Sequence, residues 1–280
     1  MRKTIVDNPS KGLSFLYNNV IGRIIIKPVV SNDFLNKFIG WLLSKKISCF
    51  LIKPFIKKNN INMDDYEKKE YKSFNDFFIR KIKSDKRTIR KEKNIFIAPC
   101  DSKLTIYKIN QSSVFSVKNS KYDVLSLIKD KTIADEYKNG YALIFRLSPE
   151  DYHRYYFVDD GNIINNYKIK GKFHTVNPIV YDKFKVFKEN NRECTIIDTS
   201  NFGKITYIEV GALLVGKIHN HNVSKKIKKG QEKGYFMFGG STVILLLKNN
   251  VVKFDSDLLK NSKNGYETVV KLGEKIGEKI

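Results

Sequence analysis

The sequence predicts an α+β fold: a mainly antiparallel β body, of the sandwich or hybrid kind, preceded by an N-terminal amphipathic helical region. Apolar residues recur at helical spacing through residues 12–58. From Asn94 onward, short apolar or alternating runs are bounded by Gly, Asn and Asp, which is typical of strands and their turns. Closely spaced glycines in the last third of the chain favour further tight turns there.

The N-terminal region, residues 1–72, is predicted to hold helices and then a linker. Asn32 is a suitable N-cap, and apolar residues follow it at helical spacing as far as Leu43. A basic amphipathic helix that carries Trp41 is typical of a segment lying in a lipid interface. A surface helix that packs its apolar stripe on the core gives the same pattern. Residues 59–72 are rich in Asn and charge, which favours a linker.

The β-rich domain, residues 73–280, is predicted to begin with a short helix capped by Ser73 and followed by a basic stretch over residues 80–93. The sequence Asp159-Asp160-Gly161 predicts a hairpin turn between two strands. Strands are predicted over residues 104–109, 141–147, 155–158, 163–169, 195–197, 204–214 and 241–247.

The chain has a large positive charge. Its 280 residues contain 52 Lys and Arg against 29 Asp and Glu, which gives a net charge of +23. Residues 1–97 hold 22 of the basic and 9 of the acidic residues, so more than half of the excess lies in the first third. Such a field favours polyanionic partners, and both nucleic acid and an anionic membrane surface qualify.

No membrane-spanning or secretory segment is expected from the sequence. The first ten residues are polar, and the apolar runs are interrupted by Lys27-Pro28 and Lys53-Pro54, well short of the ~20 residues that a bilayer requires. The three cysteines lack metal-ligand or redox spacing, so reduced thiols and no metal site are expected. We therefore expect a peripheral protein at the cytoplasmic face of the cell membrane.

The most specific local feature is the tetrapeptide Gly239-Gly240-Ser241-Thr242, which precedes an apolar strand-like run. Glycine accepts backbone conformations that expose the Gly240 carbonyl to the Ser241 hydroxyl. An N-to-O acyl shift at this bond gives an ester, and β-elimination from the ester leaves a new N-terminal pyruvoyl group. The same tetrapeptide is also ordinary turn chemistry when it stands alone.

Several further stretches accompany this tetrapeptide, and with them the chain resembles the phosphatidylserine decarboxylases. These are pyruvoyl enzymes that process themselves at a Gly-Ser bond. The stretches occur in the order found in the family and cover most of the chain from about residue 70 onward. They are SFNDFFIRK (73–81), APCDSK (98–103), LSPEDYHR (147–154), TVNP (175–178), NRE (191–193), EVGA (209–212) with VG (215–216), and KGYF (233–236) leading into GGST (239–242).

The resemblance implies a function, a cofactor and partners. Cleavage between Gly240 and Ser241 leaves a large chain, residues 1–240, and a small chain, residues 241–280, which stay associated. Ser241 becomes the covalent pyruvoyl cofactor, an electron sink for decarboxylation. The implied substrate is phosphatidylserine on an anionic membrane surface, the product is phosphatidylethanolamine, and neither a metal nor nucleic acid is expected to take part.

The resemblance also implies a processing triad, from which this chain departs. Asp101 matches the family's charge-relay carboxylate. The family pattern continues from Asp-Tyr-His-Arg to a second His, which completes the triad, but this chain has Tyr156 there. A phenol, with a pKa near 10, is a poor base at neutral pH.

The residue that replaces the missing histidine is left open by the sequence. His153 takes over the role, or His174 supplies an imidazole from a neighbouring strand, or the chain does not process itself. We favour His174 as the base, because other members often carry an apolar residue there, and reserve His153 for substrate positioning or proton transfer during decarboxylation.

Two rival functions remain from the sequence. One is a catalytically altered or silent relative in phospholipid metabolism, for which Tyr156 is the main support. The other is a basic nucleic-acid-binding protein, which needs aromatic residues interleaved with basic ones on an exposed surface. Most aromatic residues of this chain instead lie in runs typical of a core.

Overall fold

The computed structural model describes residues 2–6, 11–118, 120–181, 183–212, 218–222, 224–238 and 241–280. The α-helices of this part are α1 (Lys11–Asn18), α2 (Val20–Ser31), α3 (Asp33–Leu43), α4 (Ile52–Asn59), α5 (Phe74–Phe78), α6 (Val124–Ile128), α7 (Lys131–Asp135), α8 (Val186–Glu189) and α9 (Ser256–Lys263). Its 3-10 helices are η1 (Lys46–Leu51), η2 (Met63–Asp65), η3 (Ser84–Lys86) and η4 (Pro178–Val180).

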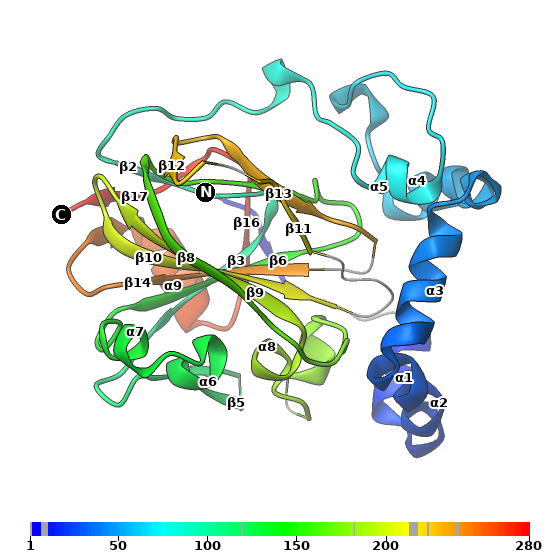
Figure 1. Cartoon of the computed structure of the whole chain (residues 1–280), viewed down its shortest axis with the longest axis horizontal. Helices are drawn as coiled ribbons and strands as arrows, with labels where there is room; N and C mark the ends of the chain where they lie inside the picture. The colour runs from blue at the N-terminus through cyan, green and yellow to red at the C-terminus, as the bar shows by residue number, and fades with distance from the viewer. Residues whose placement is uncertain are drawn as a thin grey trace.

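The strands of the described part are mostly short and, in the named ladders, antiparallel. They are β1 (Thr4–Ile5), β2 (Ile95–Ile97), β3 (Ser102–Lys108), β4 (Val114–Val117), β5 (Ser120–Asp123), β6 (Tyr141–Leu147), β7 (Arg154–Tyr156), β8 (Gly161–Ile169), β9 (Arg192–Thr199), β10 (Gly203–Gly211), β11 (Ile218–Asn220), β12 (Lys226–Ile227), β13 (Glu232–Phe236), β14 (Ser241–Leu247), β15 (Val252–Phe254), β16 (Glu267–Val270) and β17 (Lys275–Lys279). The predicted α+β class, with helices concentrated at the N-terminus, is confirmed (Figure 1).

One large sheet organises the molecule. Within the described residues it has nine strands in the order β1-β16-β3-β6-β14-β10-β9-β8-β12. Strand β14 lies at its centre, because the run Val-Ile-Leu-Leu-Leu at residues 243–247 is apolar on both sides and needs cover on both faces. Two smaller sheets in the described part, β11-β13-β7 and β15-β17-β2, lie over the large one.

The large sheet has an apolar core on each face. Along β14, Val243 and Leu245 belong to the core that includes β2, β7, β13, β15 and β17, and we name this side the sheet-covered face. Ile244 and Leu246 belong to the core that includes α1, α2, α6, α7, α8 and the β4–β5 hairpin, which is the helix-covered face. Figure 1 shows β2, β13 and β17 on one side of the sheet and α6, α7 and α8 on the other. Since side chains alternate along a strand, Ser241 points to the sheet-covered face.

The N-terminal helices stand at one end of the large sheet, beside the start of β14 (Figure 1). The predicted caps are confirmed: the Asn32 side chain accepts a hydrogen bond from the Leu35 amide, and that of Ser73 accepts one from the Asp76 amide. Tyr17 of α1 is buried in the helix-covered core, so this region packs on the β body.

The predicted hairpin at Asp159-Asp160-Gly161 is wrong. This segment does connect β7 to β8, but β7 pairs with β13 whereas β8 pairs with β9 and β12. The turn therefore carries the chain from the small covering sheet down to the large one. The stretch expected to be a linker, residues 59–72, also contains order, since Tyr66 is buried and forms a β-bridge with Ile82.

Candidate active site

Ser241 is the first residue of the central strand β14. It pairs in register with Leu147 of β6 on one side and Gly211 of β10 on the other. Its side chain is fully buried, and its Oγ has no hydrogen-bond partner among the described residues. A buried hydroxyl without a partner raises the free energy of the folded state. Gly239 and Gly240, which precede the bond expected to be cleaved, lie outside the described residues.

The segment before Ser241 is held by the N-terminal helices. The Phe238 amide donates a hydrogen bond to Oδ1 of Asn75 in α5, at 3.3 Å. The Phe238 ring packs edge-on against Phe55 of α4 and against Phe74 and Phe78 of α5, with centroid distances between 4.9 and 5.9 Å. These aromatic contacts fix the approach of the chain to β14.

His153 lies on the same side as Ser241. It precedes β7, its carbonyl accepts a hydrogen bond from the Phe236 amide, and its ring lies 4.2 Å from that of Phe78, centroid to centroid. Nδ1 donates to the Asp151 carbonyl at 2.9 Å, so the buried Nε2, which has no partner, carries the lone pair of a neutral imidazole. Burial, with the nearby charge of Arg80, lowers the pKa of His153 to about 3.

Asp101 lies just before β3, at the end of the sheet where β14 begins. Arg87 donates to both oxygens of this buried carboxylate, and Lys271 and the Leu272 amide add bonds of 3.3 and 2.9 Å. Burial alone raises the pKa of Asp101, but the Arg87 hydrogen bond and the Lys271 charge outweigh it, so the pKa falls below its usual value. Asp101 is thus a stable anion held by cations rather than by an imidazole.

Tyr156, at the position of the missing triad histidine, is half-buried and packs against the aromatic cluster that includes Phe78 and Tyr152. Its hydroxyl lies 3.2 Å from Oε2 of Glu232 and 3.2 Å from the hydroxyl of Tyr152. Burial and these neighbours raise the pKa of Tyr156 far above its ordinary value. The structure therefore does not bring this phenol to Ser241 as a base.

His174 lies among side chains of the helix-covered core. Its ring stacks on Phe184 at 4.3 Å and lies against Tyr17, and neither ring nitrogen has a hydrogen-bond partner. Burial lowers the pKa of His174 to about 4. The connection of His174 to the site is through its backbone: the Asn190 side chain donates hydrogen bonds to the carbonyls of His174 and of Gly211, and Gly211 pairs with Ser241. The structure joins neither imidazole nitrogen of His174 to Ser241 or Asp101.

A buried ion pair beside Ser241 was not predicted from the sequence. Glu209 of β10 and Lys233 of β13 are 0% and 3% exposed, and Oε2 of Glu209 lies 3.0 Å from the Lys233 ammonium. Both residues fall inside stretches that carried the family resemblance. The sequence feature that could have indicated Glu209 is a carboxylate between apolar residues, in a strand that is buried on both faces.

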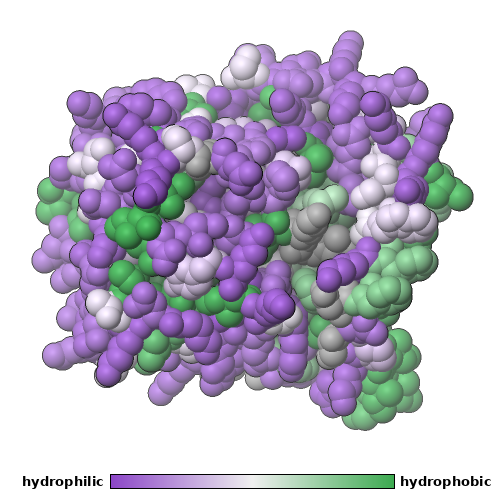
Figure 2. Space-filling view, viewed as in Figure 1, coloured by the Kyte–Doolittle hydropathy of each residue, from purple (hydrophilic) through white to green (hydrophobic). Residues whose placement is uncertain are grey.

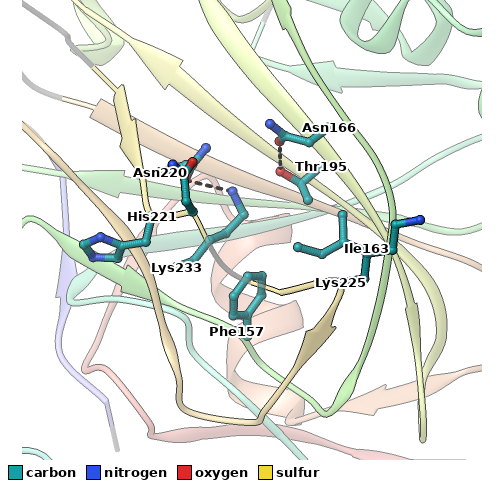
Figure 3. A pocket seen from close by; sticks show the side chains of 9 residues that line it. Phe157, Ile163, Asn166, Thr195, Asn220, His221, Lys225 and Lys233 are labelled. Carbon is teal, nitrogen blue, oxygen red and sulfur yellow. Dashed lines mark hydrogen bonds between the residues drawn. The ribbon is translucent and has the colours of Figure 1, made fainter.

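A pocket of about 190 Å³ opens next to this pair (Figure 3). Lys233 and Asn220 line one wall and point toward each other, with a 2.9 Å hydrogen bond between them. Thr195 donates to Asn166 on the opposite wall. The pocket thus carries polar groups on two walls, beside the apolar side chains of Phe157 and Ile163, and it reaches the groups that hold Glu209.

The described part of the chain contains neither a membrane-spanning helix nor a metal-binding cluster. Among the described residues, no helix has the length and apolar character needed to cross a bilayer. Those residues also contain no cluster of three or more His, Cys, Asp or Glu side chains arranged to hold a metal ion.

The family model that matches this chain and three similar relatives are all described as phosphatidylserine decarboxylases. Residues 74–278 match the family model described as phosphatidylserine decarboxylase. Phosphatidylserine decarboxylase proenzyme 2 of Clostridium acetobutylicum is 52% identical over 95% of this chain and 91% of its own length. The phosphatidylserine decarboxylase proenzymes of Clostridium botulinum and Clostridium tetani are each 43% identical over 96% of this chain and 93% and 92% of their own lengths.

These matches, together with the buried serine at the start of a central strand, define an enzyme class: decarboxylases that are made as proenzymes. The chain belongs to the phosphatidylserine decarboxylase family. The resemblance inferred from the sequence motifs is thereby confirmed.

Proposed function

We propose that the chain cleaves itself between Gly240 and Ser241, converts Ser241 into a pyruvoyl group and decarboxylates phosphatidylserine to phosphatidylethanolamine at a membrane surface. The observation that carries this proposal is the state of Ser241, which is fully buried with a hydroxyl that no described residue satisfies by a hydrogen bond. Relatives that are proenzymes by name, at 42–52% identity, support it.

The residues around Ser241 fit a pyruvoyl group. Ser241 supplies its atoms, and the orphaned Nε2 of His153 faces the same side. The group, once formed, supplies the electron sink for the loss of CO₂. We propose that His153 moves a proton at the reacting carbon and that Asp101, held by Arg87 and Lys271, fixes the loop before β3.

Association of the two chains after cleavage follows from the position of β14. Residues 241–280 contain β14 to β17 and α9. Strand β14 is hydrogen-bonded along its length to β6 and β10, which belong to residues 1–240. The small chain is therefore proposed to remain in the centre of the large sheet.

Membrane binding is proposed for the N-terminal helices. Large apolar side chains are exposed there on α2, α3 and η1, and Figure 2 shows hydrophobic surface on the side of the molecule where Figure 1 places these helices. Exposed apolar surface of this extent is typical of a docking site. These side chains are Val20, Ile21, Ile24, Ile25, Phe34, Phe38, Trp41, Leu42, Ile47 and Phe50.

Basic residues of the same segment, among them Lys45 and Lys46, suit an anionic lipid surface. A peripheral position at the cytoplasmic face is proposed because Cys49, Cys100 and Cys194 are free thiols, as in reducing compartments.

The mass of the purified protein tests processing. We expect two chains that correspond to residues 1–240 and 241–280, the second with a blocked N-terminus, and release of CO₂ from phosphatidylserine vesicles. Ser241→Ala should stay intact, folded and inactive, because no other side chain supplies both the attacking oxygen and the pyruvoyl carbon. An intact wild-type chain without activity would instead identify a silent relative. Decarboxylation by Ser241→Ala would refute the assignment of Ser241.

A further inference from the structure

The Glu209–Lys233 pair is one of the most deeply buried ion pairs among the described residues, and it lies next to Ser241. Oε2 of Glu209 accepts hydrogen bonds from Lys233 at 3.0 Å and from Nδ2 of Asn220 at 3.1 Å. The other Glu209 oxygen, Oε1, is buried and has no hydrogen-bond partner in the part of the chain that the structure describes. One oxygen is therefore neutralised, and the other keeps a free lone pair away from bulk water.

Register places Glu209 and Ser241 on the same face of adjacent strands. Gly211 lies opposite Ser241, and Glu209 lies opposite Val243. Glu209 is therefore the diagonal neighbour of Ser241, at a separation of about 7–8 Å, which a long side chain can span. Gly211 has no side chain to fill the space between them. Glu209 Oε1 and Ser241 Oγ are both buried, and neither has a hydrogen-bond partner among the described residues.

The other candidate bases are less suited to take a proton from Ser241. The Asp101 carboxylate is fully occupied by Arg87, Lys271 and the Leu272 amide. The Tyr156 hydroxyl is engaged by Glu232 and Tyr152, and the His174 ring lies among residues of the opposite core. His153 is on the correct side, but burial lowers its pKa to about 3.

Glu209 differs from these groups in its basicity. Burial raises the pKa of Glu209 above the ordinary value of a glutamate, although Lys233 and Asn220 act against the rise. A carboxylate with a raised pKa is a stronger base than an exposed one. Burial therefore acts in opposite directions on the two side chains: it strengthens the Glu209 carboxylate as a base and weakens the His153 imidazole.

We propose that Glu209 is the group that accepts the Ser241 hydroxyl proton during self-cleavage, in place of the histidine that this chain lacks. This inference rests on the proposed function. The proton moves from Ser241 Oγ to Glu209 Oε1 while Oγ forms a bond to the carbonyl carbon of Gly240. The bond from that carbon to the Ser241 nitrogen then breaks, and the nitrogen takes the proton from Glu209, which leaves an ester and a free amine. Glu209 thereby returns to its carboxylate form.

The pocket beside the pair provides a way to test this role. Lys233 and Asn220, which hold Glu209, line it (Figure 3). A volume of about 190 Å³ has room for several waters, each of which takes ≈ 30 Å³ in the liquid. A small carboxylic acid such as formate therefore has a route to the space that a shortened Glu209 side chain would leave.

Glu209→Gln in the full chain is the first experiment, with Glu193→Gln as the matched control. Glu193 is equally buried and lies directly opposite Glu209 on β9, one strand farther from Ser241. We expect Glu209→Gln to slow the appearance of the small chain by about 10²-fold or more, the usual size of a general-base contribution. Glu193→Gln should process at the wild-type rate.

A second variant separates chemistry from packing. Sodium formate should accelerate processing of Glu209→Ala in proportion to the formate concentration, whereas a purely structural role of Glu209 gives no such rescue.

If Glu209→Gln does not fold, the double variant Glu209→Gln with Lys233→Met takes its place in the comparison, because the double variant leaves no unpaired buried charge. A folded Glu209→Gln chain that processes at the wild-type rate, or a Glu209→Ala chain that formate leaves unchanged, would overturn the proposal. Failure of the wild-type chain to process would overturn the proposed function instead.

Discussion

At the scale of single residues, the side of the large sheet on which each ring lies distinguishes the buried histidines His153 and His174. His153 and His174 are both buried and, because burial lowers their pKa values, neutral at physiological pH. They differ in position: His153 lies under the small covering sheet on the side of Ser241, whereas His174 stacks on Phe184 in the opposite core. The geometry favours His153 over His174 for proton transfer.

Paired substitutions test this difference. We expect His153→Gln to be cleaved but to release CO₂ about 10²-fold more slowly per cleaved molecule, because a proton-transfer group is lost. His174→Gln should be cleaved and active at the wild-type rate, with a lower melting temperature because the aromatic stacking is lost. Intact mass, CO₂ release and thermal unfolding distinguish the two. An uncleaved but folded His174→Gln chain would return the base role to His174.

The sequence predicts part of this site because some of its signals are local. Motifs predicted roles for Ser241 and Asp101, and the structure places both at the same end of the sheet: Ser241 begins β14 and Asp101 precedes β3, with β6 between the two strands. The preference for His174 came from its position in a motif, which carries no information on the face that a side chain occupies. Glu209 was detectable as a charge within an apolar strand, but its closeness to Ser241 depends on the register of two strands far apart in sequence.

At the scale of elements, periodicity identifies strands but not their partners. The predicted strands at residues 141–147 and 241–247 agree with β6 and β14 residue for residue. The hairpin predicted at Asp159-Asp160-Gly161 failed because a turn sequence fixes a change of direction and not the sheet to which the next strand belongs. Strand β7 instead finds its partner β13 more than seventy residues later.

The apolar side chains of the N-terminal helices divide between the core and the surface. Their apolar residues are too numerous for one buried stripe, so that Ile26 and Val30 of α2 contact the core while Ile24 and Ile25 remain exposed. One side of α2 therefore packs on the core and another leaves apolar side chains exposed, while the interfacial role of the helix that carries Trp41 stays a prediction.

Substitution of the exposed side tests membrane docking. Ile24→Glu combined with Trp41→Glu should weaken binding to vesicles that contain phosphatidylserine by tenfold or more, since burial of one such side chain contributes about 1.5–3 kcal/mol. The stability of the protein should change little, because both side chains are more than half exposed. Ile164→Glu, on the exposed side of β8, is the matched control and should bind as wild type.

The dependence of vesicle binding on salt separates the electrostatic contribution to membrane docking from the apolar contribution. Wild-type binding should weaken as salt rises, because the charge attraction is screened over about 8 Å at physiological ionic strength. Binding that is unaffected by the double substitution, or retention on oligonucleotides in preference to vesicles, would contradict the membrane assignment.

At the scale of the whole molecule, the proposed cleavage cuts the chain at the centre of its largest sheet. The new small chain begins with β14, which forms seven register pairs with β6 and seven with β10. Residues on both sides of β14 belong to the two apolar cores, so removal of this strand would expose both. The folded molecule therefore cannot lose the small chain without losing its core.

This architecture predicts that the cleaved protein unfolds as one cooperative unit, in a manner that depends on its concentration. Both chains should elute together from a sizing column in native buffer, and they should separate only when the sheet unfolds. Because unfolding of the cleaved form releases two molecules, mass action should raise its melting temperature as protein concentration rises. The uncleaved Ser241→Ala chain should melt at a temperature independent of concentration, since its unfolding releases one molecule. A small chain that elutes separately in native buffer would show that β14 is not held by the two cores as the structure indicates.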